Sequence, residues 1–171
     1  EQTSLNDHWQ ILPRASLTYK MKDFYLSAIA GLYQQLPENS FLLRNQHLSA
    51  ERCWQYILGA YHEANGKTFR LEVYNKKYHN LAINLNNNYK SDGYGYARGI
   101  DLFLNDREVV KNLEYMLAYS YNDSKRKYGD YPAEAMPQYA TRHNLSVALK
   151  YWVQPIRSTI GITDRYASGR P

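Results

Sequence analysis

The segment TFRLEVYN, residues 68–75, decides the fold class because apolar and polar side chains alternate along it. Phe69, Leu71 and Val73 fall on one set of positions, and Arg70 and Glu72 fall between them. Successive side chains of a β-strand point to opposite faces, whereas a helix would spread these two sets around its circumference. The segment is therefore predicted to be a strand with one apolar face and one polar face.

The same period of two recurs along the rest of the chain and predicts about eight strands in all. Many of these segments have the roughly 9 to 11 residues that a tilted strand needs to cross a membrane. The further segments are ASLTYKM (15–21), FYLSAIAGLYQ (24–34), CWQYILGAYHE (53–63), ARGIDLFLN (97–105), LEYMLAYSY (113–121), NLSVALKYWV (144–153) and STIGITDRYA (158–167).

The links between these segments alternate between short and long. The short ones are MKD, ANGK, NDREVVK and QPIR, and Asn65-Gly66 is the strongest hairpin signal among them. The long polar links cover residues 36–52, 79–96 and 123–141. An up-and-down antiparallel sheet produces this alternation when all its long loops leave at one edge, as in outer-membrane barrels. The predicted fold class is therefore all-β, an antiparallel up-and-down transmembrane barrel.

Composition agrees with this prediction. The chain has 18 tyrosines against 4 phenylalanines, and its aromatic residues lie toward the ends of the predicted strands as well as in their middles. Aromatic residues at strand ends are interpreted as the interfacial girdles of a barrel, and in a soluble sheet they would be packing residues. Its mean hydropathy of −0.68 and the absence of a run of about 20 apolar residues exclude a transmembrane helix. The net charge of +5 comes from scattered lysines and arginines, which favours a solvated surface over nucleic-acid binding.

The glycine-rich stretch SDGYGYARGIDLFL, residues 91–104, does not have the spacing of a dinucleotide-binding loop and runs into a predicted strand. Its glycines are interpreted as a loop turning into a strand, with Tyr94 and Tyr96 at the level of a membrane interface. The histidines lack metal-ligand spacing, Cys53 stands alone, and no nucleophile motif is present. We therefore predict no catalytic residue, no cofactor and no metal site.

Several of these segments together resemble the barrel of TonB-dependent outer-membrane receptors, especially the type with a carboxypeptidase-like regulatory N-terminal extension. The resemblance covers nearly the whole chain, through residues 12–38, 47–81, 91–107, 113–152 and 158–171. It assigns structural positions to Leu48, Glu51, Tyr56, Gly59, Gly99, Asp101, Leu102, Pro137, Arg142, His143, Leu145 and Ser168–Pro171.

The resemblance implies a transporter in the outer membrane of a Gram-negative bacterium. Such receptors have about 22 strands, a plug domain and a TonB-contacting box, so residues 1–171 are expected to be a partial barrel without plug or box. The implied partners are the plug and the other barrel strands, TonB with its inner-membrane energising complex, a surface lipoprotein lid, and lipid or lipopolysaccharide. The imported nutrient would be a siderophore, cobalamin, oligosaccharide or peptide, and the family transports without catalysing a reaction.

Ligand contacts are expected from the long links, residues 36–52, 79–97 and 123–141. The candidate ligand-binding residues are Arg44, Asn45, Tyr94, Tyr96, Lys125, Arg126 and Tyr131. Two other interpretations remain open at this point. One is a small closed eight-stranded barrel with a structural or adhesive role, and the other is a soluble β-sheet module that binds sugar or peptide. A partial barrel would also have two open edges, which are expected to pair with another chain or another copy of this one.

Overall fold

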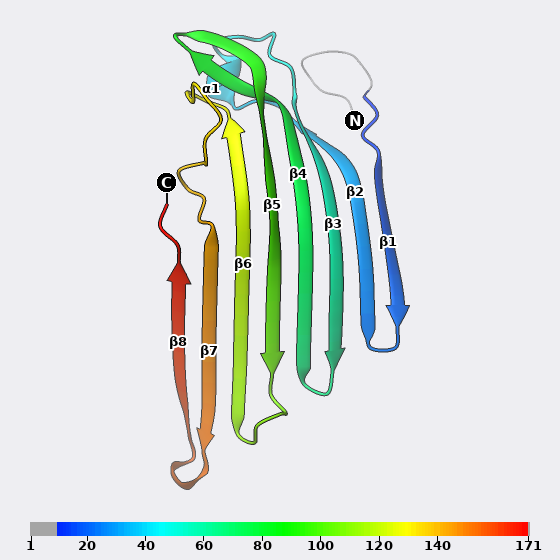
Figure 1. The fold of residues 1–171 in the computed structure, drawn as a ribbon, viewed down its shortest axis with the longest axis vertical. Helices are drawn as coiled ribbons and strands as arrows, with labels where there is room; N and C mark the ends of the chain where they lie inside the picture. Colours follow the sequence, from blue (N-terminus) through cyan, green and yellow to red (C-terminus); the bar gives the residue numbers. More distant parts are fainter. Residues whose placement is uncertain (1–9, 171) are drawn as a thin grey trace.

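The computed structural model describes residues 10–170, which form one antiparallel sheet whose eight strands lie side by side in chain order (Figure 1). The all-β, up-and-down prediction is confirmed. The strands are β1 (Arg14–Met21), β2 (Phe24–Gln35), β3 (Glu51–Ala64), β4 (Lys67–Leu85), β5 (Asn88–Asp106), β6 (Leu113–Lys127), β7 (His143–Val153) and β8 (Ser158–Ala167), with a short helix α1 (Asn39–Leu42) and a 3-10 turn η1 (Gln154–Ile156) between them.

The β1–β2, β3–β4, β5–β6 and β7–β8 connections lie at one end of the sheet, and the β2–β3, β4–β5 and β6–β7 connections lie at the other (Figure 1). The β3–β4 turn has positive φ at both central residues, 49° at Asn65 and 68° at Gly66. A type I′ hairpin requires this geometry, because its twist matches that of the two strands. The hairpin predicted from the Asn-Gly pair is therefore confirmed.

The link predicted over residues 79–96 is not a loop, and this prediction was wrong. β4 and β5 are each 19 residues long and continue to a two-residue turn at Asn86 and Asn87, with φ of 55° and 60°. Asparagine tolerates the left-handed region better than most residues, so this pair makes the same type of turn as Asn-Gly. Likewise, β6 continues to Lys127, so the following loop begins at residue 128 rather than 123.

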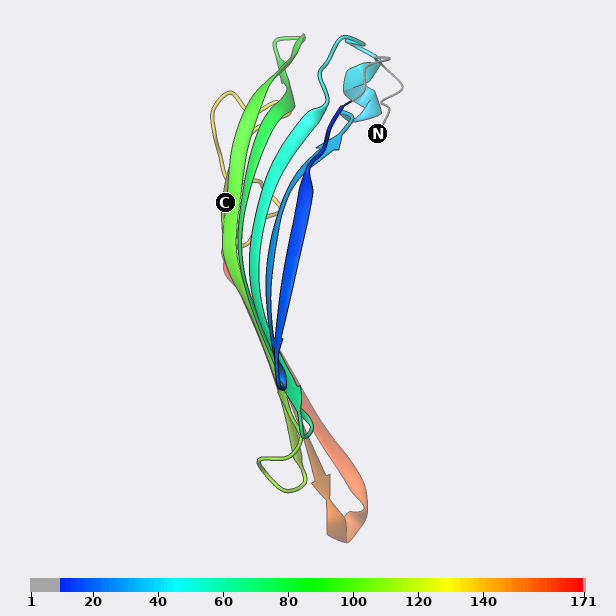
Figure 2. The same ribbon diagram turned by 90° about the vertical axis from the view of Figure 1, so that its right-hand side faces the viewer.

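The sheet is a single curved and twisted layer, as the edge-on view in Figure 2 shows. Directly opposed residues on neighbouring strands share a face, and Val73 is opposite Leu58 on one side and Ile100 on the other. This row continues through Ala28 to Leu17. We call the side that carries these residues the apolar face.

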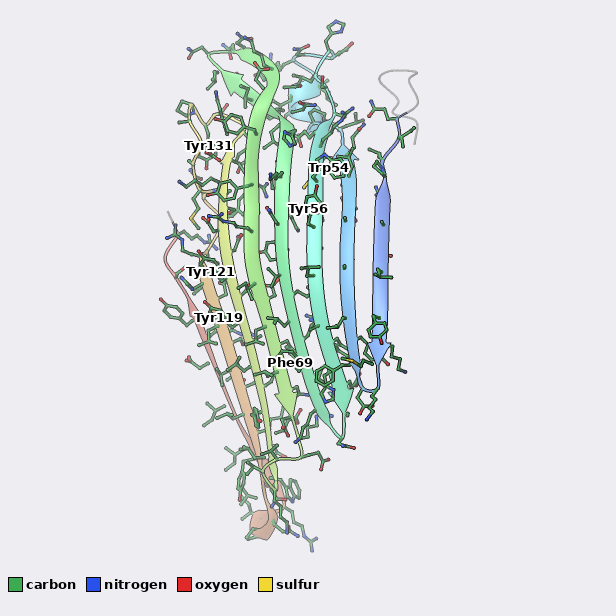
Figure 3. The ribbon with its side chains drawn as sticks, turned by 45° about the vertical axis from the view of Figure 1, so that its right-hand side comes forward. Trp54, Tyr56, Phe69, Tyr119, Tyr121 and Tyr131 are labelled. Carbon is green, nitrogen blue, oxygen red and sulfur yellow. The ribbon has the colours of Figure 1, made fainter. Side chains whose placement is uncertain are left out.

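The apolar face is uncovered across the described sheet. Leu17 is 70% exposed and Leu58 is 63% exposed, although both lie in the middle of strands. Trp54, Tyr56 and Phe69 belong to the same face by register and come from two neighbouring strands, β3 and β4 (Figure 3). Large apolar side chains so placed bury no surface against another layer. They therefore require a non-aqueous environment, as the outward side of a membrane barrel does.

The opposite side, which we call the polar face, has hydroxyl, amide and charged side chains in corresponding rows. One row contains Thr18, Ser27, Glu72, Asp101 and Ser120. Two carboxylates directly opposite each other would be costly in an apolar environment. The alternation read from residues 68–75 is thus confirmed across the sheet, with the polar face suited to a wet interior.

Neither alternative interpretation matches this architecture. In the described residues β1 pairs with β2 and β8 with β7, and β1 does not pair with β8, so these strands do not close a small barrel. A soluble module would hide its large apolar side chains in a core, whereas those of the apolar face are exposed. Within residues 10–170, no helix combines the length and apolar character that crossing a membrane would require.

Candidate ligand-binding site

A cavity of about 460 Å³ lies against the polar face, between strands β4–β6 and the loop that follows β6. The strands contribute Lys76, Tyr78 and Arg126, and the loop contributes Tyr139 and Thr141. Lys76 and Tyr78 lie an even number of residues from Glu72 along β4, and Arg126 lies an even number from Ser120 along β6. Because side chains alternate between the two faces of a strand, all three lie on the polar face. The cavity therefore opens on the side of the sheet that suits water and polar ligands.

The loop over this cavity, residues 128–142, is fixed by backbone hydrogen bonds. The amide of Gly129 donates to the Ala82 carbonyl at 2.8 Å, and the Asn84 amide donates to the Gly129 carbonyl at 2.7 Å. Arg126 and Ala135 exchange two more backbone hydrogen bonds, of 2.8 and 3.1 Å. These bonds satisfy main-chain groups that the irregular segment would otherwise leave unpaired. The loop is held by the extended part of β4 and the end of β6.

Side-chain packing fixes the same loop from within. Pro137 is less than 2% exposed and Ala140 is 7% exposed. The phenol rings of Tyr128 and Tyr131 stack with their centroids 5.2 Å apart. Burial, followed by the neighbouring Tyr139 phenol, raises the pKa of Tyr128 to about 12, against a smaller opposing effect of Arg126. Tyr128 therefore stays neutral at physiological pH and can act as a hydrogen-bond donor.

Arg126 is the central cation of the cavity. Its guanidinium lies 4.0 Å from the centroid of the Tyr78 ring, a cation–π contact, and its Nη1 donates to the Tyr139 hydroxyl at 3.4 Å. Its Nε is buried and has no hydrogen-bond partner among the described protein groups, and the same holds for Oδ1 of Asn122. Both residues line the cavity. The planar guanidinium of an arginine is well suited to bind a carboxylate, a catecholate or a phosphate.

Acidic groups lie at the other end of the cavity. Glu72 on β4 is directly opposite Asp101 on β5, and the Ser120 hydroxyl donates a short hydrogen bond to Asp101. Along β4 the side chains on the polar face run from Glu72 through Tyr74 and Lys76 toward the loops. The cavity is thus acidic toward the middle of the strand and basic toward the loops, with tyrosine rings between. This mixed lining can bind a ligand that carries both charged and ring-like groups.

Close packing between strands positions Tyr74. It is directly opposite Gly99, and a Cβ added at Gly99 would lie 2.5 Å from the Tyr74 hydroxyl and would also clash with the Tyr121 carbonyl. Only glycine leaves room for the phenol to lie over the β5 backbone. Gly99 thereby positions the Tyr74 ring, which lines the cavity.

The predicted ligand-binding residues do not lie together. Arg126 lines the cavity. Three of the predicted residues lie on the apolar face, away from the cavity. These are Tyr94 and Tyr96, an even number of residues from Ile100 along β5, and Lys125, an even number from Tyr121 along β6. Tyr131 lies in the loop over the cavity and stacks on Tyr128.

The remaining two predicted residues follow α1. Asn45 donates from Nδ2 to the Tyr89 carbonyl at 2.9 Å, and Arg44 is exposed. The cavity is also lined by Lys76, Tyr78 and Tyr139, which are not among the residues predicted from the sequence. Once β4 is recognised as a long strand, its alternation identifies the first two. Within residues 10–170, no group of three or more His, Cys, Asp or Glu side chains is arranged to hold a metal ion.

A one-layer antiparallel sheet with an apolar outward face, a polar inner face and long loops at one end defines the wall of a transmembrane β-barrel. The chain matches the family model described as TonB dependent receptor-like, β-barrel, over residues 1–171. It therefore belongs to this family, and the resemblance seen in its sequence is confirmed.

Solved structures show the same fold. The FrpB iron transporter from Neisseria meningitidis (F3-3 variant) is similar with a TM-score of 0.70 and 15% identity, over 91% of this chain and 26% of that one. The ferric-catecholate import receptor Fiu from E. coli K12 has a TM-score of 0.71 and 13% identity, over 90% and 24%. This chain thus spans about a quarter of each of these proteins. No curated protein matches it in sequence.

Proposed function

We propose that this chain is part of the barrel wall of an outer-membrane receptor that imports a scarce nutrient. One observation carries the proposal: an uncovered apolar face and a polar face with a loop-covered cavity lie on opposite sides of the same eight strands. The family match supports the same function. A barrel wall does no chemistry itself, so we expect binding and passage of the ligand without a catalytic step.

The ligand is proposed to bind near the loops at the basic end of the cavity. Arg126 supplies positive charge, and Tyr78 and Tyr139 supply rings and hydroxyl groups. Ferric chelates are the first ligands to test, because the two similar structures are those of an iron transporter and a ferric-catecholate import receptor. Cobalamin, oligosaccharides and peptides are the other classes, and the mixed lining accommodates each of them.

The remainder of the receptor is the partner that this sheet requires. Among residues 10–170, the outer edges of β1 and β8 pair with no other strand, and further barrel strands would pair with them. A plug domain would cover the polar face, with the paired Glu72 and Asp101 carboxylates available to its cations. Energy for import would come from TonB and its inner-membrane complex, and a lipoprotein lid would act at the loops. The regulatory extension expected from the sequence concerns a segment outside this chain and stays a prediction.

The direct test is uptake by cells that express the whole receptor containing this sequence. Iron-55 loaded catecholate and hydroxamate chelates, cyanocobalamin, and labelled oligosaccharides and peptides would be compared in strains with and without TonB. We expect one class to enter only when both receptor and TonB are present. Uptake of none of these classes, or uptake that does not depend on the receptor, would contradict the proposal.

One substitution and one control test whether the ligand binds in this cavity. Arg126→Gln removes a charge-assisted hydrogen bond, which is worth about 1.5–3 kcal/mol, and should weaken ligand binding to the purified receptor about 10- to 100-fold. Arg157→Gln is the matched control, because Arg157 is exposed in the β7–β8 turn at the far end of the sheet. Equal affinities for the Arg126→Gln receptor and wild type would exclude this cavity as the binding site.

A further inference from the structure

The polar face has most of the cation–π contacts of the sheet. Among residues 10–170 there are six such contacts, and five of them lie on this face. Three lie toward the loops, and they join Arg14 to Tyr33, Lys76 to Tyr74 and Arg126 to Tyr78. The other two lie near the end that carries the β1–β2 and β3–β4 turns, away from the cavity. The same arrangement, a cation over a ring, therefore occurs at both ends of the polar face.

The two contacts near the short turns belong to one row of directly opposed residues across β1–β5. We call this the cation–ring row, and its members are Lys20, Tyr25, Tyr61, Arg70 and Phe103. The Lys20 Nζ lies 5.2 Å from the centroid of the Tyr25 ring, and the centroids of the Tyr25 and Tyr61 rings are 5.9 Å apart. The Arg70 guanidinium lies 6.0 Å from the centroid of the Phe103 ring. Each member lies close to the short-turn end of its strand (Figure 1).

The two cations of this row can bind an anion. Within residues 10–170, neither Lys20 nor Arg70 forms a salt bridge, and both side chains are exposed. The nearby Glu63 carboxylate accepts a short hydrogen bond from the Tyr61 hydroxyl. An arginine stacked on a ring still presents its fork of N–H donors to an anionic oxygen, and an ammonium group binds such oxygens as a point charge. The tyrosine rings between the cations provide flat surfaces for a ring of the ligand.

Distance and charge separate this row from the cavity. Arg70 is eight residues from Tyr78 along β4, which is about 27 Å at about 3.4 Å per residue. Glu72 and Asp101 are directly opposite each other on the same face and lie between the two. Like charges repel, so an anionic ligand would occupy the cavity or the row and not the acidic stretch between them. The wall therefore offers such a ligand two separate sites.

We propose that the cation–ring row is a second binding site for the transported ligand, on the release side of the wall, and that it takes an anionic group carried on a ring. The cavity at the loops would bind the ligand first, and the row would bind it once the plug has moved. Uronate sugars and catecholate iron complexes share this chemistry, whereas neutral oligosaccharides do not. The inference rests on the transport function proposed above.

Site-specific photo-crosslinking tests whether a ligand reaches the row. p-Benzoylphenylalanine would replace Phe103 in the whole receptor, in cells with and without TonB. The probes are the ferric complex of carbon-14 2,3-dihydroxybenzoate and tritiated trigalacturonate. We expect at least one probe to be captured at position 103 when TonB is present, and the captured probe distinguishes an iron complex from an acidic sugar. The same crosslinker at position 102, on the apolar face, should capture neither, and the neutral ferric acetohydroxamate and galactotriose should not be captured at position 103.

Substitutions distinguish the cation–ring pairs from positive charge alone. Arg70→Gln removes a charge-assisted hydrogen bond, so the probe concentration for half-maximal capture should rise about tenfold. Adding Lys20→Gln should raise it about tenfold again, and the single variant keeps the test valid if the double variant does not fold. Arg165→Gln is the matched control and should leave capture unchanged. Arg165 is an exposed cation on β8 that continues the same row, three strands or about 14 Å beyond Phe103, and among residues 10–170 it contacts no aromatic ring as a cation–π partner.

The inference is overturned if neither anionic probe is captured, if capture does not depend on TonB, or if the neutral probes are captured equally. It is also overturned if Arg70→Gln and Arg165→Gln behave alike, or if position 103 crosslinks only to the plug and carries no label. A nutrient that enters with TonB but never labels position 103 would refute this inference and leave the transport proposal standing. Absence of TonB-dependent entry for every nutrient class would instead refute the transport proposal.

Discussion

The sharpest prediction compares two neighbouring residues of β1 that point to opposite faces. Leu17 lies on the apolar face in the row of Ala28 and Leu58, and Thr18 lies on the polar face opposite Ser27. Both positions are exposed in the isolated sheet. A water-soluble sheet would therefore accept arginine at either position with a change in stability within about 0.5 kcal/mol.

In a membrane barrel, arginine at position 17 and arginine at position 18 should have different effects on the unfolding free energy. Arginine on the lipid face near the bilayer midplane costs about 2–4 kcal/mol, so Leu17→Arg should lower the unfolding free energy of the whole receptor by that amount. Thr18→Arg faces the wet interior and should change it by less than about 0.5 kcal/mol. Leu58→Arg, on an interior strand and 63% exposed here, should repeat the effect of Leu17→Arg.

The assay is reversible unfolding of the receptor in lipid vesicles with urea, followed by tryptophan fluorescence and by gel migration without heating. The difference between Leu17→Arg and Thr18→Arg is the informative quantity, because both variants add the same side chain to the same strand. Equal unfolding free energies for the two variants, or a larger loss for Thr18→Arg, would refute the assignment of the two faces.

Three further predictions address the site and the turns. Gly99→Ala should displace Tyr74 and weaken ligand binding, and a crystal structure with the phenol unmoved would contradict this. The Asp106 carboxylate accepts from the amides of Glu108 and Val109 at 2.8 and 2.9 Å, so Asp106→Ala should destabilise the receptor by about 1–2 kcal/mol and Asp106→Asn by less. Folding raises the pKa of the Tyr128 hydroxyl to about 12. Between pH 10 and about 12 this hydroxyl therefore keeps its proton in the folded state and loses it in the unfolded state. The unfolding free energy of the receptor should therefore fall as the pH rises from 10 to about 12, and it should fall less in the Tyr128→Phe variant. The urea midpoint of each protein, measured across this pH range, tests the prediction.

The parts of the fold that the sequence predicts are those set by local chemistry. The alternation of Phe69, Leu71 and Val73 with charged residues identifies a strand, because only a period of two separates these sets. Asn65-Gly66 identifies a hairpin for an equally local reason. The bounds of β8, residues 158–167, agree with prediction because a turn with Arg157 at φ 48° interrupts the chain just before it.

The longer links required information that local patterns do not contain. Register shifts after His79 and Leu81 interrupt the alternation of β4, so its extension looks like a polar loop in sequence. The loop of residues 128–142 folds back because its backbone pairs with Ala82 and Asn84, more than 40 residues earlier. Lys125 and Arg126 were both assigned to a loop, where neighbouring residues can share a ligand. In a strand they necessarily lie on opposite faces.

The central claim is that one face of this sheet contacts hydrocarbon and the other lines an interior, and nitroxide accessibility along β4 tests it most directly. With Cys53 replaced by Ser, single spin-labelled cysteines would be placed at each position from 69 to 74 of the whole receptor in lipid vesicles. The account predicts high oxygen and low nickel-chelate accessibility at positions 69, 71 and 73, and the reverse or protection from both at 70, 72 and 74. Uniform accessibility along the six positions, or nickel access at 69, 71 and 73, would contradict it.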